Sequence, residues 1–531
     1  MMIASPLYVI LSVGIGAMVL YAMVLLARRR VHGPLPPGPP GKPILGNIYD
    51  LPPPGAQDWM HWLKFKDRYG QISSISVMGQ TIVILNHHRI AMDLLGKRSA
   101  IYSSRPNLVY ASQMVGWEHI LAMQTYSDRL RAYRKAMQPY LGSETAVSQY
   151  NELQEVESHR FLLRVLKDPK NLIQHISTEA GAVILKIAYG YTIEPDKMDP
   201  LVHIAKMALE QFSVAGTPGA WLVDIFPALR YIPSWFPGAG FKRTAQVWKQ
   251  NLQHVADKPY AFVRQRMESG NYDPSYLSNL FEAGGYPPNG TEEEMVAKWT
   301  AASLYTGGAD TTVSSVQTFF LAMTLYPEVQ RKAQEEIDRV LGGARLPTVV
   351  DRASLPYVDA VVKETLRWHP VAPMGISHMS VKDDMYEGHL IPEGSLVLAN
   401  IWAFAHDTEV YHDPMKFKPE RFLNVDGGEP ELDPRTFVFG FGRRICPGRI
   451  LADCALYLII SRSLAVFDVR KEVRNGHEVH VEPEFRPGVI SHPLPWEFNI
   501  RPRSPSCEAL IRSVEETHPW KGSDAVALDT S

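Results

Sequence analysis

The sequence has few cysteines and almost no excess of either charge, and each shortage excludes a class of protein. Only three cysteines occur among its 531 residues: Cys446, Cys454 and Cys507. So small and odd a set does not make a disulfide framework, and it indicates a reducing compartment in which a thiolate survives. The formal net charge is −2, so no basic excess suggests a nucleic-acid partner.

Internal repeats and long low-complexity or single-sign charged tracts are also missing from the middle of the chain. Length alone would suggest about three domains. The composition, 45% hydrophobic and 21% charged, is that of an ordinary globular protein. We therefore predict one large catalytic domain over residues 46–503, followed by a polar, disordered tail over residues 504–531.

The first 27 residues contain no charged side chain. This run exceeds the about 20 apolar residues that a helix needs to cross a bilayer. Arg28, Arg29 and Arg30 follow directly, and by the positive-inside rule they keep the remainder of the chain in the cytosol. A cleaved signal peptide is the alternative, but the basic n-region is missing and the arginines stand where cleavage would occur. The sequence therefore predicts a single transmembrane anchor over residues 1–27.

A basic and proline-rich hinge, residues 28–45, joins this anchor to the body. Proline fixes φ, so the run from Pro34 to Gly41 is stiff. We expect it to hold the body at a set angle to a membrane. With the body in the cytosol, the glycosylation acceptor at Asn289 would never meet the transferase.

The body is predicted to be mainly α, with a small β region near each end. Residues 72–85 alternate loosely around Gly79, which is typical of a β-hairpin. Thr291 and Glu294 form a capping box, and the long apolar helix that they begin would span roughly 50 Å before Pro327 ends it. The helices expected in the second half of the body span residues 291–326, 327–341 and 354–368.

One loop contains the most chemistry, the ten residues from Phe439 to Gly448. Its glycines let the backbone adopt positive φ and pass close to a flat ligand. Cys446 precedes an apolar helix that begins near Arg449, where the helix dipole and free N–H groups lower a thiol pKa and make the sulfur a ligand. Arg444 is placed to pair with a carboxylate of the bound group. Cys454, farther along that helix, is predicted to be a buried core thiol.

This loop resembles the haem-binding signature of the cytochrome P-450 superfamily, Phe-x-x-Gly-x-Arg-x-Cys-x-Gly. A structural cysteine in a glycine-rich turn is the alternative. The resemblance extends over nearly the whole chain, to about residue 502. It implies the cytochrome P-450 fold and a haem cofactor whose iron is held by the Cys446 thiolate. All five fixed positions match, at Phe439, Gly442, Arg444, Cys446 and Gly448.

A second family motif is a Glu-x-x-Arg pair upstream, which Glu364 and Arg367 match. Other Glu-x-x-Arg pairs in this chain are typical of surface contacts between residues three apart. Glu364 is selected by its apolar helix and by the Pro-Glu-Arg-Phe segment downstream, which contains Arg421. The resemblance implies that the three residues form a buried charge network that holds the haem loop and does no chemistry itself.

The long helix contains the string Gly307-Gly308-Ala309-Asp310-Thr311. Two glycines within a helix cost about 1 kcal/mol each against alanine, so they need a reason. The string resembles the family's oxygen-activation motif. By that match Thr311 holds a hydrogen-bonded water network and Asp310 supplies protons to it. A kinked core helix with buried threonines is the alternative.

Two basic residues are candidate partners of the haem propionates. One is His378, for which an exposed loop histidine is the alternative. The other is Arg134, which matches the family's Trp-x-x-x-Arg motif except that Leu130 stands where the tryptophan would be. One hydrogen bond is therefore expected to be missing. The basic residues beside Arg134 form either a solvated face or a docking patch for an acidic reductase: Arg129, Arg131 and Lys135.

The family further implies a monooxygenase that uses O2 and two electrons. The sequence contains no flavin or dinucleotide domain, so a separate NADPH–cytochrome P-450 reductase is expected, with both proteins in the endoplasmic reticulum membrane. Residues 367–373 resemble fungal microsomal members linked to secondary metabolism. Two rivals remain: a haem-thiolate isomerase or dehydratase without reductase, disfavoured by Asp310 and Thr311, and an inactive membrane-tethered binding protein, disfavoured by Cys446, Glu364 and Arg367.

An apolar pocket and a membrane anchor together favour a lipophilic substrate. The segment over residues 212–241 has several aromatic residues among prolines. Three interpretations stay open for it: a pocket wall, part of the core, or a lid that dips into the membrane. By analogy with the family, the pocket is expected to be lined by residues 103–123, 212–241, 302–312, 371–376 and 488–492.

Overall fold

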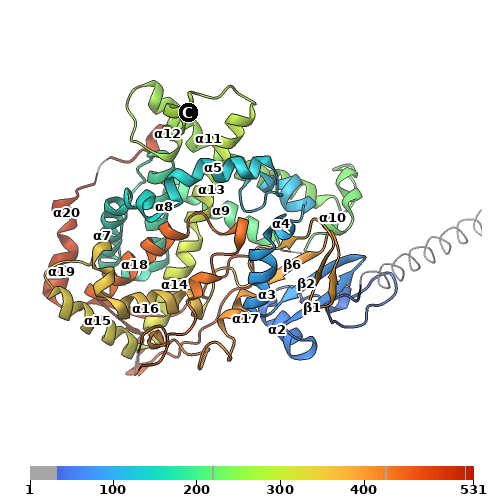
Figure 1. Ribbon diagram of the computed structural model, residues 1–531. Coiled ribbons are helices and arrows are strands. Elements are labelled where there is room, and N and C mark those ends of the chain that lie inside the picture. Colours follow the sequence, from blue (N-terminus) through green and yellow to red (C-terminus); the bar gives the residue numbers. More distant parts are fainter. Residues whose placement is uncertain (1–32, 196, 218–219, 425–426, 521, 531) are drawn as a thin grey trace, which may run out of the picture.

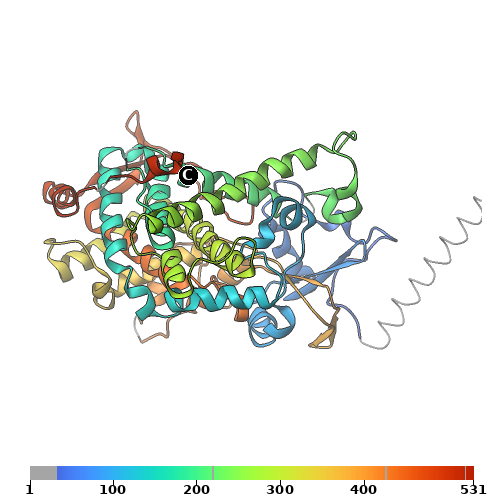
Figure 2. The same ribbon diagram turned by 90° about the horizontal axis from the view of Figure 1, so that it is seen from above.

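The computed structural model describes residues 33–195, 197–217, 220–424, 427–520 and 522–530. It is mainly helical with small sheets, as predicted. The largest sheet lies at one end of the molecule and most of the helices at the other (Figures 1 and 2). The longer helices are α2 (Asp58–Tyr69), α5 (Asp128–Leu141), α7 (Asn151–Lys167), α8 (Leu172–Tyr189), α9 (Pro200–Ala215), α11 (Gly240–Glu268), α13 (Glu292–Ala309), α14 (Thr311–Leu325), α15 (Pro327–Leu341), α16 (Pro356–Trp368) and α18 (Arg449–Val466).

Shorter helices lie between these, and α19 and α20 follow the last strand. They are α3 (His88–Ala91), α4 (Ser99–Tyr102), α6 (Glu144–Ser148), α10 (Leu222–Ile225), α12 (Tyr276–Gly284), α17 (Ile401–Ala405), α19 (Pro505–Arg512) and α20 (Val514–Thr517). The strands are β1 (Ile72–Val77), β2 (Gln80–Leu85), β3 (His378–Met379), β4 (Asp384–Tyr386), β5 (His389–Ile391), β6 (Leu396–Ala399), β7 (Phe467–Lys471), β8 (Val473–Arg474), β9 (His477–Glu478) and β10 (Phe498–Pro502).

The largest sheet joins distant parts of the chain in the order β1-β2-β6-β3. The predicted hairpin is confirmed: β1 and β2 pair antiparallel from Ile72 opposite Leu85 to Val77 opposite Gln80. Strand β2 also runs parallel to β6, and α2 and α3 pack on β1 and β2. Burial on both faces explains why the run from residue 83 to 85 is continuously apolar. Three two-stranded pairs, β4 with β5, β7 with β10 and β8 with β9, complete the described β structure.

The predicted continuous helix over residues 291–326 is interrupted at Asp310, so that prediction is wrong. Asp310 has φ −128° and ψ −33°, which ends α13 before α14 begins at Thr311. The Thr311 hydroxyl donates to Gly307 O at 2.7 Å across this break, a contact that threonines also make inside the unbroken helices. Gly307 and Gly308 weaken the same turn by about 1 kcal/mol each.

The capping box at the start of α13 is half formed. The Thr291 hydroxyl accepts from the Glu294 N–H at 3.3 Å, as predicted. The Glu294 carboxylate accepts from the Gly290 N–H at 2.6 Å instead of from Thr291. Both α13 and α14 lie in the core, α13 against α5, α8, α9 and α11 and α14 against α8, α16 and α18. The burial predicted for this segment is therefore confirmed.

The boundaries of the next two helices follow the predicted signals. Helix α15 begins at Pro327 and ends at Leu341, before Gly342 with φ 65°. Helix α16 begins at Pro356, two residues later than predicted, and ends at Trp368 as predicted. Proline at the first helical position and glycine after the last explain why these ends are visible in the sequence.

The proline-rich hinge packs against strands where the structure describes it. The Ser74 N–H and hydroxyl donate to Pro37 O at 2.8 Å and Pro36 O at 2.6 Å, and the Leu390 N–H donates to Pro34 O at 2.7 Å. The predicted anchor, residues 1–27, lies outside the described residues. Within the described residues, no helix has both the length and the apolar character needed to cross a membrane.

The segment expected to be a disordered tail is largely helical instead. Helices α19 and α20 pack on α7, and their Ile511 and Val514 side chains are buried. His159 on α7 lies 2.9 Å from Leu510 O, and the Trp520 ring lies 4.0 Å from the Arg160 guanidinium carbon. The polar average of the segment conceals a few apolar residues at helical spacing, which supply this contact. Figure 1 shows α19 and α20 beside α7.

Candidate active site

A tight loop places Cys446 just before α18. The Cys446 N–H donates to Phe439 O at 2.8 Å, which closes the loop on itself. Gly442 has φ 50°, and a Cβ on it would lie 2.6 Å from Leu95 O, so only glycine fits there. A Cβ on Gly448 would lie 4.0 Å from Cys446 Sγ. The loop therefore holds Cys446, a half-buried residue, in a fixed position.

The acidity of the Cys446 thiol differs from the prediction. Burial raises its pKa above the ordinary value, while the Gly448 N–H and the charges of Arg134 and Arg449 act in the opposite direction. The predicted net lowering of this pKa is wrong, because the loss of thiolate hydration outweighs the favourable dipoles. The thiolate is favoured here when a cation such as iron binds the sulfur.

Two buried guanidinium groups lie beside this loop and contact only carbonyl oxygens. Arg444 Nε donates to Ser103 O at 2.6 Å, and the same guanidinium donates to Leu121 O and Gln124 O. Arg105 donates to Ala122 O at 3.0 Å and to the carbonyls of residues 376 and 377. Burial lowers the pKa of both groups, that of Arg444 to about 10. Neither has a carboxylate partner in the described part of the chain, so two haem propionates would supply the missing counter-charge.

The other two predicted propionate residues each contact a backbone carbonyl. His378 is buried, not exposed, and its Nδ1 lies 2.6 Å from Tyr102 O. Burial and the charge of Arg105 hold its pKa well below the ordinary value. Arg134 Nη1 donates to Ile445 O at 3.1 Å, next to Cys446. Leu130, one turn earlier on α5, is buried in the core, so the indole hydrogen bond of the family motif is replaced by apolar packing.

The structure brings Glu364, Arg367 and Arg421 together as a fully buried ion network. Arg367 donates to the two Glu364 oxygens at 2.7 and 2.8 Å, and Arg421 Nε lies 3.2 Å from the same carboxylate. The Lys418 N–H adds a fourth donor at 2.7 Å. Glu431, which the sequence did not reveal, pairs with the far end of Arg421. These contacts connect α16 to the segment that leads to the Cys446 loop.

The break between α13 and α14 sets Asp310 against a histidine. His492 Nε2 lies 3.2 Å from Asp310 Oδ2, and both side chains are partly exposed. Thr311, by contrast, is bonded to Gly307 O within its own helix turn. A Cβ on Gly308 would lie 2.9 Å from Ile184 Cγ1, so this glycine permits close packing on α8. Packing thus explains Gly308, whereas a Cβ on Gly307 would meet nothing within 4 Å.

Four of the five segments expected to line a pocket meet along α13 and α14. Ser303 accepts from the Leu121 N–H at 2.9 Å, and the Ser491 N–H donates to Val371 O at 2.8 Å. Ser314 donates to Ser491 O, which joins the loop over 488–492 to α14. The fifth segment joins through its start, where the Phe212 and Trp117 rings lie 4.4 Å apart.

The remainder of that fifth segment has two kinds of aromatic residue. Trp221 stacks on Tyr110 with ring centroids 3.6 Å apart, so it belongs to the packed body. Tyr231 and Trp235 are 73% and 79% exposed, and Phe236 is about half exposed. These three side chains therefore line neither a pocket nor a core.

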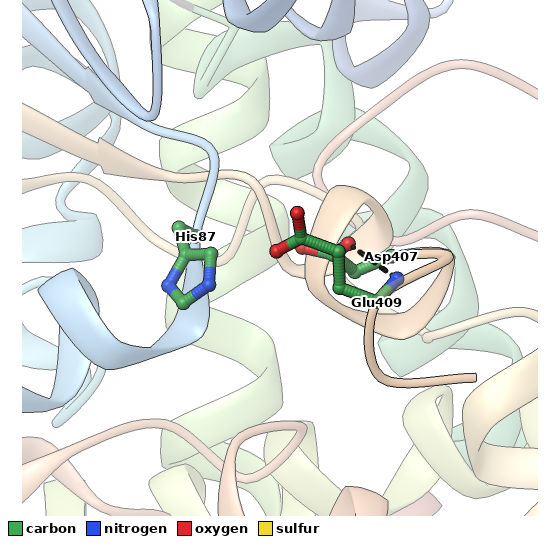
Figure 3. Close-up of side chains that lie close together, drawn as sticks. All are labelled: His87, Asp407 and Glu409. Atoms are coloured by element: carbon green, nitrogen blue, oxygen red, sulfur yellow. Dashed lines mark hydrogen bonds between the residues drawn. The ribbon is translucent and has the colours of Figure 1, made fainter.

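A separate cluster of one histidine and two acidic residues has the composition of a metal site, but its buried carboxylate already pairs with a lysine. His87, Asp407 and Glu409 lie close together where α3 begins (Figure 3). Lys66 Nζ lies 2.9 Å from Asp407 Oδ2, and the Glu409 N–H donates to Asp407 Oδ1 at 3.1 Å. Because a lysine already neutralises the buried carboxylate, the cluster fits an ion pair and a turn cap better than a metal centre.

Sequence reasoning missed Arg105 and His492 as individual residues, although both lie in segments expected to line the pocket. Neither belongs to a motif, and the partner of His492 and two of the three partners of Arg105 are more than a hundred residues away. The one weak signal is that no acidic residue lies within four positions of Arg105, so a buried Arg105 would need a counter-charge from elsewhere.

Comparison with known proteins gives a consistent answer. The model of the family "Cytochrome P-450" matches residues 36–500. The chain is 50% identical over 505 residues to cytochrome P-450 monooxygenase ppsD of Aspergillus oryzae, covering 95% of each chain. It is 48% identical to cytochrome P-450 monooxygenase claR of Ampulloclitocybe clavipes, over 98% of this chain and 96% of the relative. It is 45% identical to O-methylsterigmatocystin oxidoreductase of Aspergillus flavus, over 95% and 94%.

Proposed function

The chain belongs to the cytochrome P-450 family, and from this premise we propose that it oxidises a lipophilic molecule of secondary metabolism with electrons that a reductase takes from NADPH. As a family member it is a haem monooxygenase that uses O2, a small-molecule substrate and a redox partner. The observation that carries the proposal is the Cys446 loop beside two buried guanidiniums that have no acidic partner among the described residues.

Haem with a thiolate ligand supplies the oxygen-activating chemistry when it is bound. In this chain Cys446 Sγ would hold the iron, and Arg105, Arg444 and His378 would face the propionates. Arg134 would stay on the loop carbonyl beside the sulfur. Since the guanidiniums are buried, ion pairs with the propionates would be strong and would orient the ring.

Proton supply falls to the residues at the helix break. The Asp310 carboxylate is partly exposed and would hold a proton at Oδ2. The Thr311 hydroxyl would rotate from Gly307 O toward a water on the haem side. The carbonyl released at Gly307 offers that water a second partner, so the break provides both a donor and an acceptor.

A lipophilic substrate is favoured by the apolar residues that the pocket segments contribute to the core around α13. Met114, Ile376 and Val489, from three of the segments, pack against that core. One relative is named for O-methylsterigmatocystin, so this compound is the natural first probe of a substrate panel. Polyketide, terpenoid and indole scaffolds complete the panel.

The experiment uses microsomes from yeast that express the full chain with a fungal reductase. The panel is supplied with NADPH under ¹⁸O₂, and products are analysed by mass spectrometry. We expect one product to gain one ¹⁸O atom, and only when NADPH is present. Conversion of a hydroperoxide probe without NADPH, with no ¹⁸O product from the panel, would instead identify the isomerase or dehydratase class and contradict the proposal.

We further propose that the protein is anchored in the endoplasmic reticulum membrane with its catalytic domain in the cytosol. Besides the charge-free run at the N-terminus, the exposed side chains of Tyr231, Trp235 and Phe236 support this. The segment that contains them and the sheet next to the hinge lie at the same end of the molecule (Figures 1 and 2). Amphipathic aromatic rings are typical of membrane interfaces.

The orientation has a simple test, because Asn289 is an exposed glycosylation acceptor. In a cytosolic domain it stays unmodified, so endoglycosidase treatment of the full chain is expected to leave its mass unchanged while alkaline carbonate leaves it in the membrane pellet. A mass shift that Asn289→Gln abolishes would place the domain in the lumen.

A further inference from the structure

The contact between Asp310 and His492 joins two segments that the fold holds rigidly. Asp310 lies in the break between α13 and α14, and His492 ends a loop that returns from the last strands. Ser491 fixes that loop: its N–H donates to Val371 O at 2.8 Å and its hydroxyl donates to Arg486 O at 2.7 Å. The imidazole is therefore held near the carboxylate, with Nε2 and Oδ2 3.2 Å apart.

Water reaches both side chains of the pair, so the His492 imidazole can exchange its proton with solvent. Its side chain is 21% exposed, and that of Asp310 is 23% exposed. The titratable side chains that the described structure sets against it are Asp310 and His369. Burial, with a smaller contribution from the positive charge of His492, lowers the pKa of His369 to about 3. His369 therefore stays neutral at physiological pH, so it does not compete for the proton.

We propose that His492 is a positioning residue that orients Asp310 and passes it a proton. The proton leaves Nε2 of the imidazolium for Oδ2 of the carboxylate, and the neutral imidazole regains a proton from water. This inference rests on the proposed function, in which Asp310 supplies protons for the reduction of O2. The alternative is that the contact only fastens the loop to the helix, and a hydrogen bond without proton transfer is enough for that.

The pair itself is tested by histidine NMR on the haem-loaded, reduced, carbon monoxide-bound full chain, in which the iron is diamagnetic. The His492 signal is assigned by its loss in His492→Gln. We expect Asp310→Asn to change the chemical shift of this signal, because it removes the carboxylate that lies 3.2 Å from Nε2. His480, which lies 2.6 Å from Glu482 on the exposed surface, is the internal control and does not respond. A His492 signal that Asp310→Asn leaves unchanged would overturn the pair.

The proton transfer is tested by NADPH-driven oxygen consumption of the holoenzyme with excess reductase. Glutamine at position 492 keeps a hydrogen-bond donor but carries no exchangeable charge. We expect His492→Gln to slow oxygen consumption about tenfold, less than the hundredfold typical of a direct proton donor, and to enlarge the solvent deuterium isotope effect. His480→Gln is the matched control and retains the wild-type rate. An unchanged rate and isotope effect in His492→Gln would overturn the proposal.

The roles of Asp310 and His492 can be disproved separately. If Asp310→Asn leaves oxygen consumption unchanged, the role of Asp310 in the proposed function is wrong. If Asp310→Asn slows the reaction and His492→Gln does not, only the inference about His492 is wrong.

Discussion

The change Glu364→Gln perturbs a fully buried charge. Its carboxylate accepts two hydrogen bonds from Arg367, one from Arg421 and one from the Lys418 N–H, and the side chains of Glu364, Arg367 and Arg421 are 0–1% exposed. Glutamine removes the charge and turns an N–H₂ group toward guanidinium donors. Arg421 keeps Glu431, but Arg367 is left with carbonyl partners alone. Breaking one partner of such a network costs about 3–5 kcal/mol.

The expected loss converts to a measurable shift. An unfolding entropy of about 2.1 cal/mol/K per residue over 531 residues gives about 1.1 kcal/mol per degree, so the thermal midpoint should fall by about 3–5 °C. Calorimetry of the haem-loaded protein measures this. The matched control is Glu335→Gln, which removes a pair with Arg331 that is about 60% exposed, and it should shift the midpoint by less than about 0.5 °C. Equal shifts in the two variants would refute the reasoning.

Three further predictions concern the cofactor cradle, a buried acid and the C-terminal helices. Arg105→Leu should weaken haem retention about tenfold, or about 1.4 kcal/mol, measured by transfer to apomyoglobin, and an unchanged transfer rate would remove Arg105 from the cradle. Burial raises the pKa of Glu179 to about 8 in the folded state. Between about pH 4.5 and pH 8, this carboxyl is therefore protonated in the folded state and ionised in the unfolded state. Its contribution to stability therefore falls as pH rises through that window, and Glu179→Gln should gain thermal midpoint over wild type at pH 8 but not at pH 4.5; a pH-independent difference would contradict this. Ile511→Ala should cost about 2–3 kcal/mol locally and speed proteolytic removal of the C-terminal helices, whereas the exposed Val526→Ala should not.

The elements that could be predicted are those whose ends are marked by local chemistry. The β1–β2 hairpin is centred on Gly79, and α15 lies between Pro327 and Gly342. The break at Asp310 could not be predicted in the same way, because no proline marks it and the side-chain partner of Asp310, His492, lies 182 residues away. The C-terminal helices were missed because the contacts of Ile511 and Val514 with α7 come from tertiary structure, which the polar composition of that segment does not reveal.

The residues of the site also fall into those that a local motif marks and those that only the fold brings together. Cys446, Glu364 and Arg421 belong to motifs whose spacing can be read directly, so the sequence located them. Arg105 and His492 belong to no motif, and only the fold brings them to their partners. The sequence predicted a lowered Cys446 pKa because it shows the helix that follows the cysteine. It does not show the burial of the thiol, which raises this pKa and depends on the folded chain.

The central claim is that the Cys446 thiolate binds haem iron, and the carbon monoxide difference spectrum of the reduced full chain tests it most directly. We predict the strongly red-shifted Soret band of thiolate ligation in the wild type and in Cys507→Ala, whose thiol lies outside the Cys446 loop. Cys446→Ala should lose that band while the protein stays folded. An unshifted band in folded wild-type protein, or a red-shifted band that persists in Cys446→Ala, would contradict the account.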